Sequence, residues 1–170
     1  MDEGKYEFWI EGVEKLALSL GTELNETLID LFKKRIGTVI IASIDADCRP
    51  HTAPFHYITV QDNKHLRVAI SKFHQTLQNI NQIRDVALAL LEEGDIAVSL
   101  KGKAKLVKET MEADRNLAVI EVEIEEVCKN NSTDFFVTQG VRIRHKNEAS
   151  LHYSCQIFQE LLEGYQRISN

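Results

Sequence analysis

The fold is decided by the stretch HLRVAISKFHQTLQN, residues 65–79. In its first half, apolar residues alternate with other residues up to Ile70, the period-two pattern of a strand with one buried face. Ser71 follows at once, and the polar residues after it are typical of a helix start. We therefore predict a strand that runs directly into a helix.

The predicted helix start is polar. Its first backbone N–H groups have no intrahelical partners and lie at the positive end of the helix dipole, so it can hold an anion such as a phosphate. The side chains that gather there are Ser71, Lys72, His74, Gln75 and Thr76. Ordinary helix capping explains the same residues, so their spacing alone leaves both interpretations open.

The residues before this stretch predict a β-hairpin. Apolar residues predominate in residues 39–44 and 52–60, and a polar turn with Asp45, Asp47 and Arg49 separates the two runs. Apolar runs flanking a short polar turn are typical of two antiparallel strands. The predicted order is therefore strand, strand, strand and helix.

Three more strands are expected after the helix. Residues 85–91 are almost continuously apolar, as in a strand buried on both faces. In residues 96–106 and in residues 118–124 apolar residues alternate with polar ones. The outer face of the first strand carries lysines, and the outer face of the second carries glutamates. Six antiparallel strands of this length can close into a barrel. The small residues Gly102 and Ala104 either mark a bulge or bend, or leave room for a planar ring or a second subunit.

Helices and one small hairpin are predicted outside these strands. Apolar residues recur at helical spacing in residues 6–20 and 24–35, which predicts two N-terminal helices. Residues 157–168 form the apolar face of a final helix. Residues 135–144 predict a further small hairpin, centred on Gln139 and Gly140.

Composition excludes several classes of function. The chain has 170 residues, 44% of them hydrophobic, and a net charge of −6, which argues against a nucleic-acid partner. The one local basic row is Lys101, Lys103 and Lys105. We expect no membrane partner, because no apolar run approaches the length of a span, and we expect no export, because residues 1–20 show no basic region followed by an apolar one. A cytoplasmic location is therefore expected.

No metal site or hydrolytic centre is predicted. Cys48, Cys128 and Cys155 lie far apart without a paired CxxC motif. His51 and His56 are five residues apart in one predicted strand and so point to opposite faces. The sequence shows neither a nucleophile elbow nor a phosphate-binding glycine loop, so we assign no catalytic residue.

A family resemblance adds to this interpretation. The run RPHTAP at residues 49–54, followed after a hairpin by SKFHQT at residues 71–76 and by Asn79, resembles the FMN-binding split-barrel superfamily. That superfamily includes the pyridoxamine 5'-phosphate oxidases, and the motif is most similar to small bacterial FMN-binding proteins and flavoredoxins. His74, Thr76 and Asn79 match their pattern, whereas Gln75 stands where those proteins tend to carry lysine. The resemblance covers roughly residues 28–127.

The resemblance implies a mainly β fold with flanking helices (α+β). The expected form is a six-stranded antiparallel split β-barrel with two N-terminal helices and a C-terminal helix. We expect one domain over residues 1–170, with N-terminal helices in 1–37, the barrel in 38–127, and the hairpin and last helix in 128–170.

The resemblance also implies FMN as cofactor and a homodimer with the flavin at the subunit interface. Ser71, Gln75 and Thr76 would hold the phosphate, and the backbone of two strand segments would flank the ring. The final helix, or the region of Phe55 and Tyr57, is the expected partner surface. The implied cofactor-binding residues are Thr52, Ala53, Pro54, Ala69, Ile70, Ser71, Lys72, His74, Gln75, Thr76 and Asn79.

The implied function is an FMN-dependent oxidoreductase acting on a small molecule, because a bound flavin carries the redox chemistry itself. One alternative is an electron-transfer FMN-binding protein without its own substrate. Another is a haem-binding or haem-degrading split barrel that uses His145 or His152, and a deazaflavin in place of FMN also stays open. A vitamin B6 oxidase is disfavoured, because Arg142, Arg144 and His145 match its arginine-rich C-terminal signature poorly.

Overall fold

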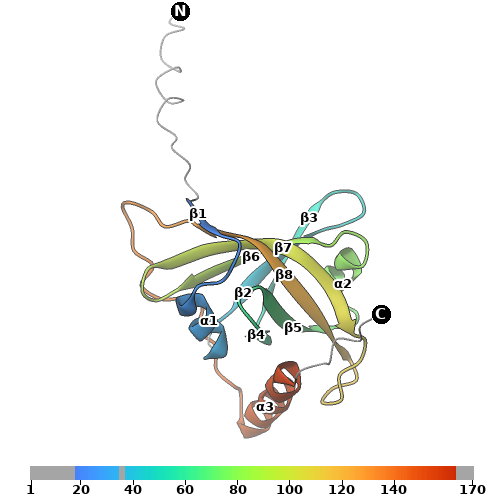
Figure 1. Ribbon diagram of the computed structural model, residues 1–170. Coiled ribbons are helices and arrows are strands. Elements are labelled where there is room, and N and C mark those ends of the chain that lie inside the picture. Colours follow the sequence, from blue (N-terminus) through green and yellow to red (C-terminus); the bar gives the residue numbers. More distant parts are fainter. Residues whose placement is uncertain (1–17, 35–36, 164–170) are drawn as a thin grey trace, which may run out of the picture.

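An antiparallel sheet curls through most of the structure, a computed structural model that describes residues 18–34 and 37–163 (Figure 1). The described residues contain three helices, α1 (Glu26–Lys33), α2 (Gln75–Ile80) and α3 (Glu148–Leu162). Their eight strands are β1 (Leu18–Gly21), β2 (Val39–Ile44), β3 (Pro50–Phe55), β4 (Ile58–Val60), β5 (His65–Ser71), β6 (Asp85–Glu92), β7 (Ile96–Lys108) and β8 (Leu117–Lys129). The strand order is β3-β2-β6-β7-β8-β5-β4, and β1 pairs with the C-terminal end of β8.

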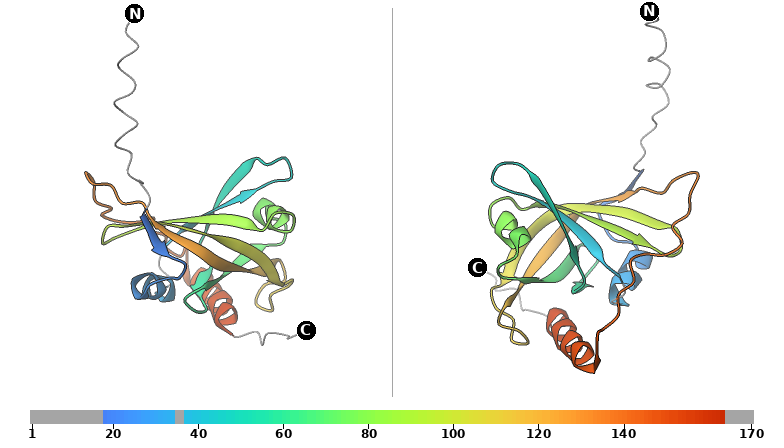
Figure 2. Two further views of the ribbon diagram at one scale, coloured as in Figure 1. Left: turned by 45° about the horizontal axis from the view of Figure 1, so that its top comes forward. Right: turned by 180° about the vertical axis from the view of Figure 1, so that it is seen from behind.

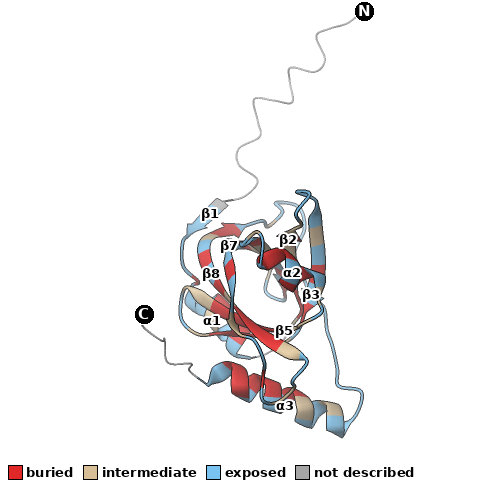
Figure 3. Cartoon of the chain, turned by 90° about the vertical axis from the view of Figure 1, so that its right-hand side faces the viewer, coloured by how far each residue is buried: buried red, intermediate tan, exposed pale blue. Residues whose placement is uncertain are grey.

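The two longest strands, β7 and β8, form the middle of the sheet. They pair antiparallel from Val98 opposite Lys129 to Lys108 opposite Val119. The alternation predicted for both is confirmed, and the outward lysines form ion pairs with neighbouring strands, such as Lys101 with Glu126 at 2.7 Å. Figures 2 and 3 show the curl of the sheet, and Figure 3 shows buried residues along its strands.

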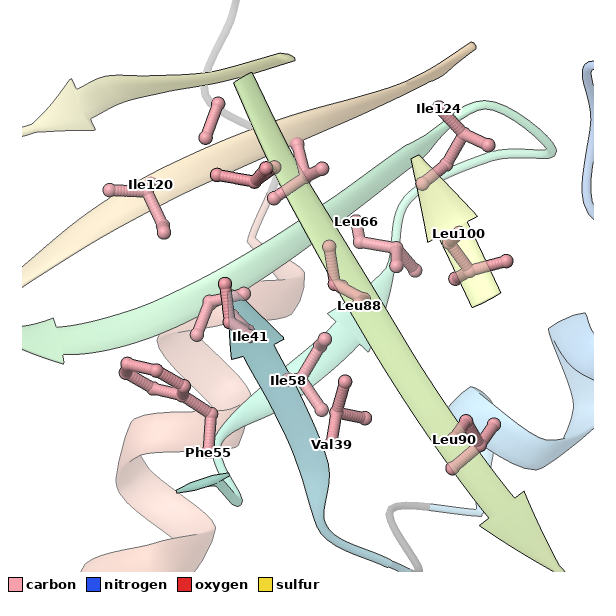
Figure 4. Close-up of a cluster of buried hydrophobic side chains, with 14 of the residues drawn as sticks. Val39, Ile41, Phe55, Ile58, Leu66, Leu88, Leu90, Leu100, Ile120 and Ile124 are labelled. Carbon is pink, nitrogen blue, oxygen red and sulfur yellow. The ribbon is translucent and has the colours of Figure 1, made fainter. Parts of the chain in front are cut away.

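The main hydrophobic core lies inside this curl. It draws on every strand from β2 to β8, and α1 closes one side with Leu28 and Phe32. Burying one such leucine or isoleucine side chain stabilises the fold by about 1.5–3 kcal/mol. Figure 4 shows the inward side chains Val39, Ile41, Phe55, Ile58, Leu66, Leu88, Leu90, Leu100, Ile120 and Ile124.

Gly102 marks a bulge. The register of β7 against β8 shifts between Lys101 and Gly102. A Cβ atom at Gly102 would lie 1.9 Å from the backbone oxygen of Glu123, so no other residue fits without moving β8. Of the two explanations for small residues here, the bulge is therefore confirmed at Gly102.

A second hydrophobic cluster lies between α3 and the outer side of β5. It contains Ala69, Met111, Val119, Ile157, Phe158 and Leu161. The buried Glu160 fastens α3 to the β7–β8 connection, because its carboxylate accepts hydrogen bonds from the Lys108 ammonium at 2.6 Å and the Ala113 N–H at 2.9 Å. On the apolar face predicted for the final helix, Ile157, Phe158 and Leu161 are thus covered within the chain and Leu162 is exposed, while the rest of that face lies outside the described residues.

Residues 130–147, which we call the arm, connect β8 to α3. The predicted hairpin over residues 135–144 is wrong, because these residues, all within the described part, form no strand. Hydrogen bonds to β6 and the β6–β7 turn hold the arm instead. The Val137 N–H donates to the Asp95 carboxylate at 3.0 Å, and Arg142 pairs with Glu92 at 2.6 Å.

Other boundaries also differ from the prediction. Residues 18–20, expected at the end of the first helix, belong to β1, and the rest of that helix lies outside the described residues. The predicted strand over residues 52–60 is two strands, β3 and β4, separated by His56 and Tyr57. Strands β1 and β4 raise the number from the six expected to eight in the described residues. The helix predicted over 24–35 is confirmed as α1.

Candidate functional site

The backbone N–H groups at the start of α2 are capped by groups of the same segment. His74 is the N-cap, and its Nδ1 accepts a hydrogen bond from the Thr76 N–H at 3.1 Å. The His74 carbonyl accepts from the N–H groups of Leu77 and Gln78. Ser71 Oγ accepts from the Phe73 N–H at 3.3 Å. These backbone N–H groups are therefore satisfied within the chain, as in ordinary capping.

The His74 ring packs against two aromatic side chains of β3. Its centroid lies 5.2 Å from that of Phe55 and 6.1 Å from that of His51. Burial, together with the nearby His51, lowers the pKa of His74 below its ordinary value of 6.5. A neutral ring whose Nδ1 accepts a hydrogen bond carries its proton on Nε2, so that atom is a donor.

Behind His74, α2 and the sheet share a buried polar network. The Gln75 amide donates to Asn79 Oδ1 at 2.9 Å, and Asn79 Nδ2 donates to Ser43 Oγ on β2 at 3.0 Å. We call His51, Phe55, His74, Thr76 and Asn79 the α2–β3 cluster. It joins β3 to α2 and its N-cap.

Two polar atoms of the α2–β3 cluster are buried without a partner. Thr76 Oγ1 and His51 Nε2 make no hydrogen bond to any described residue. Thr76 as a whole is 0% exposed. An unpaired buried hydroxyl costs about 1–3 kcal/mol, so native structures nearly always pair such groups with protein, water or a ligand. This place is therefore suited to an additional hydrogen-bonding molecule.

The cations near this cluster already have contacts. Lys72 Nζ donates to Thr110 Oγ1 at 2.5 Å, and within the described residues it forms no ion pair. Arg49 in the β2–β3 turn pairs with Asp47 at 2.6 Å and with Asp45 at 3.2 Å. Of the two, Lys72 is thus the one whose charge is not already paired with a carboxylate of the described residues.

The remaining predicted cofactor residues are divided between two faces of the sheet. Ala53 is buried in the main core, whereas Thr52 and Pro54 are exposed on the outer face of β3. Ala69 lies beneath α3, and Ile70 is in the main core with 1% exposure. The side chains of Ala53, Ala69 and Ile70 are therefore covered within the chain, whereas those of Thr52 and Pro54 are open.

The outer face of β2 and β6 is a feature that the sequence interpretation missed. The run 85–91 suggested a strand buried on both faces, but Ala89 and Leu91 are exposed, as is Ile40 on β2. A groove of about 610 Å³ lies on this face and is lined by residues of β2, β3 and β6 and by interior positions of β7 and β8, among them Ala42, Pro50, Ala87, Lys101 and Glu126. In the sequence, the apolar residues at alternate positions of both strands could have indicated this exposed apolar face.

A second cavity, of about 260 Å³, lies between the arm, α3 and the β3–β4 junction. We call it the α3 cavity. His145 lines it and its Nδ1 lies 3.3 Å from Ser154 Oγ, whereas His152 is exposed on α3. His56 also lines the α3 cavity, whereas the His51 ring lies beside the ring of His74. The two histidines therefore point in different directions, as predicted.

Two classes of site are absent from the part of the chain that the structure describes. Within it, three or more histidine, cysteine or acidic side chains nowhere gather as they would around a metal ion. Its helices are too short or too polar to span a membrane.

Comparisons with known proteins agree with the fold. A presumed pyridoxamine 5'-phosphate oxidase of Lactobacillus delbrueckii is 28% identical, with a TM-score of 0.56 over 64% of this chain and 97% of that one. HupZ of Group A Streptococcus is 16% identical (TM-score 0.53; 71% and 99% covered), and a presumed pyridoxamine 5'-phosphate oxidase of Listeria innocua is also 16% identical (TM-score 0.51; 63% and 98%). The last two support the fold alone.

At the level of sequence, no curated protein matches the chain. The family model described as pyridoxamine 5'-phosphate oxidase matches residues 26–145, which is more than half of the chain and contains the α2–β3 cluster. The predicted superfamily is thereby confirmed. This chain belongs to the pyridoxamine 5'-phosphate oxidase family.

Proposed function

We propose that this protein binds FMN at the α2–β3 cluster and acts as an oxidoreductase on a small molecule. Membership of the family supports a flavin cofactor. The observation that carries the proposal is the pair of buried, unpaired atoms Thr76 Oγ1 and His51 Nε2. A phosphate or a polar edge of a flavin ring supplies the acceptors that such donors lack.

The residues of the cluster fit a phosphate group in part. The Thr76 hydroxyl and His74 Nε2–H are neutral donors, and Lys72 supplies a positive charge whose present partner is only a hydroxyl. Because His74 caps the helix, side chains rather than the backbone of α2 would provide most of the contacts. Bound FMN would supply the redox chemistry, and these side chains would hold and orient it.

We also propose that the protein is a homodimer in which a second copy covers the outer face of β2, β3 and β6. Ile40, Pro54, Ala89 and Leu91 present an apolar surface there, and Leu91 is 56% exposed. Exposed apolar surface of this kind marks an interface. A two-fold contact would place two copies of the 610 Å³ groove at the subunit boundary, where a flat ring can be enclosed.

The alternatives differ in measurable ways. An electron-transfer flavoprotein would bind FMN but show no turnover with NAD(P)H alone. Haem would involve His145, since of the two candidate histidines only this one lines the α3 cavity. That cavity, at about 260 Å³, is below the range of roughly 300–1,000 Å³ typical of larger ligands, so the arm would have to move for haem to enter.

The test is an absorption spectrum of the purified protein, followed by titration of apoprotein with FMN. We expect flavin absorption, or saturable binding with quenched flavin fluorescence, at one FMN per chain. A Soret band without flavin binding would instead establish the haem alternative. Failure to bind any flavin, including a deazaflavin, would overturn the proposed function.

A further inference from the structure

The α3 cavity has mostly apolar walls. Tyr57 and Phe158 meet edge to face with ring centroids 5.6 Å apart, and Val141 and Ile143 of the arm contribute branched side chains. Aromatic and branched walls of this kind favour a ligand with a compact apolar group.

Most polar side chains around the cavity already have partners, which fixes the shape of the walls. The Tyr57 hydroxyl shares a hydrogen bond with Ser154 Oγ at 3.0 Å, and His56 Nδ1 shares one with Thr38 Oγ1 at 3.0 Å. Arg142 is bound by Glu92 at 2.6 Å. A wall held in this way loses little conformational entropy when a ligand binds.

Arg144 is the exception. It lines the mouth of the cavity with an exposed side chain, and it makes no ion pair or hydrogen bond with any residue in the described part of the chain. Its neighbour Arg142 uses its charge on Glu92, whereas the charge of Arg144 is uncompensated. A guanidinium group holds a carboxylate through two parallel hydrogen bonds, so Arg144 provides a specific anchor for an anion.

We propose that the α3 cavity binds a small organic carboxylate whose carboxylate group meets Arg144 and whose aromatic or branched group packs against Tyr57 and Phe158. The volume of about 260 Å³ suits a single ring with one carboxylate group rather than a mononucleotide. The site shares no residue with the α2–β3 cluster, so it does not rest on the proposed FMN function.

The experiment is calorimetric titration of the full chain with benzoate and with cyclohexanecarboxylate. We expect saturable binding at one site per chain, weakened about tenfold or more by Arg144→Ala through loss of a charged, hydrogen-bonded partner. Arg115→Ala, which removes an exposed arginine of the β7–β8 connection, is the matched control and should bind as the wild type does. Val141→Trp, at an exposed wall position, should block the cavity without removing charge.

Several results would overturn the proposal. The first is no saturable binding of either carboxylate, and the second is equal binding by the wild type and Arg144→Ala. Inorganic phosphate competing as well as benzoate would show that the apolar walls contribute nothing. A Soret band that disappears in His145→Ala would assign the cavity to haem instead.

Discussion

The α2–β3 cluster and the α3 cavity differ in how far their polar groups are hydrogen-bonded. In the cluster, packing is tight and two polar atoms, Thr76 Oγ1 and His51 Nε2, are buried without partners among the described residues. In the cavity there is open space, yet Tyr57, Ser154 and His56 are already paired. The cluster thus offers unmet hydrogen bonds, whereas the cavity offers volume and one uncompensated charge. The same kind of substitution should therefore change stability and ligand binding differently in the two regions.

The largest expected effect separates the two regions with matched aromatic truncations. Phe55→Ala and Phe158→Ala each remove a ring that is less than a tenth exposed, so each should lower the free energy of unfolding by about 3–5 kcal/mol. Phe55 also supports the His74 ring, so its loss should weaken FMN binding, whereas Phe158→Ala should not. Chemical denaturation and FMN titration of both variants measure this. Equal loss of FMN affinity in the two variants would contradict the assignment of the flavin to the cluster.

Removing the contact between the arm and β6 should have the next largest effect. Glu92 is 5% exposed and pairs with Arg142, so Arg142→Ala leaves a carboxylate buried without its cation. The free energy of unfolding should fall by about 2 kcal/mol. The effect is smaller than for a fully buried pair because the Arg142 side chain is 42% exposed. Denaturation of this variant beside Arg115→Ala measures the difference. An unchanged midpoint in Arg142→Ala would show that the arm does not depend on this pair.

Between pH 5.5 and 7.5, the lowered pKa of His74 should make stability depend on pH through the cluster. The lowered pKa of His74 means that the unfolded chain binds a proton more readily than the folded one. Its contribution to stability is therefore complete above pH 6.5 and declines as the pH falls from 6.5 through the lowered folded pKa. Asparagine also caps helices and does not titrate, so His74→Asn should remove this part of the pH dependence. Denaturation of the wild type and of His74→Asn at pH 7.5 and 5.5 tests this. If the unfolding free energy changes equally between the two pH values in both proteins, His74 does not cause the pH dependence.

The smallest effect concerns the charge at the start of α2. Gln75 stands where the small FMN-binding proteins tend to carry lysine, and its amide now donates to Asn79. Gln75→Lys should tighten FMN binding by up to about 1 kcal/mol, the value of an exposed ion pair. Gln78→Lys, exposed on the same helix, is the control and should have a smaller effect. Weaker or unchanged binding in Gln75→Lys would argue against a phosphate at this helix start.

Strands and helices with clear periodicity could be predicted from the sequence. The alternation of Leu100, Gly102 and Ala104 with lysines gave β7 its correct faces, and the run into Ser71 gave β5 and α2 in the right order. The two short elements β1 and β4 have too few residues to show a period, and their pairing with long neighbours creates them. The arm was mistaken for a hairpin because its apolar side chains alternate without a pairing partner.

The candidate site could be predicted only as a set of residues. Sequence placed His74, Thr76 and Asn79 together correctly, because they share one short helix. It could not show that His74 accepts a hydrogen bond from Thr76, or that Ala69 is covered by α3, which lies far along the chain. Both facts depend on tertiary packing. The burial of Phe55, and of Ile157, Phe158 and Leu161 on α3, likewise depends on tertiary packing.

The most direct test of the central claim is Thr76→Val, measured in two ways and compared with Thr27→Val on the exposed surface of α1. Replacing an unpaired buried hydroxyl with a methyl group should raise the unfolding free energy of the apoprotein by about 1 kcal/mol. The same change should weaken FMN binding by about 1.5–3 kcal/mol, because the ligand loses a charge-assisted hydrogen bond. A variant that is more stable and binds FMN less tightly supports the account. Unaltered FMN affinity would contradict it.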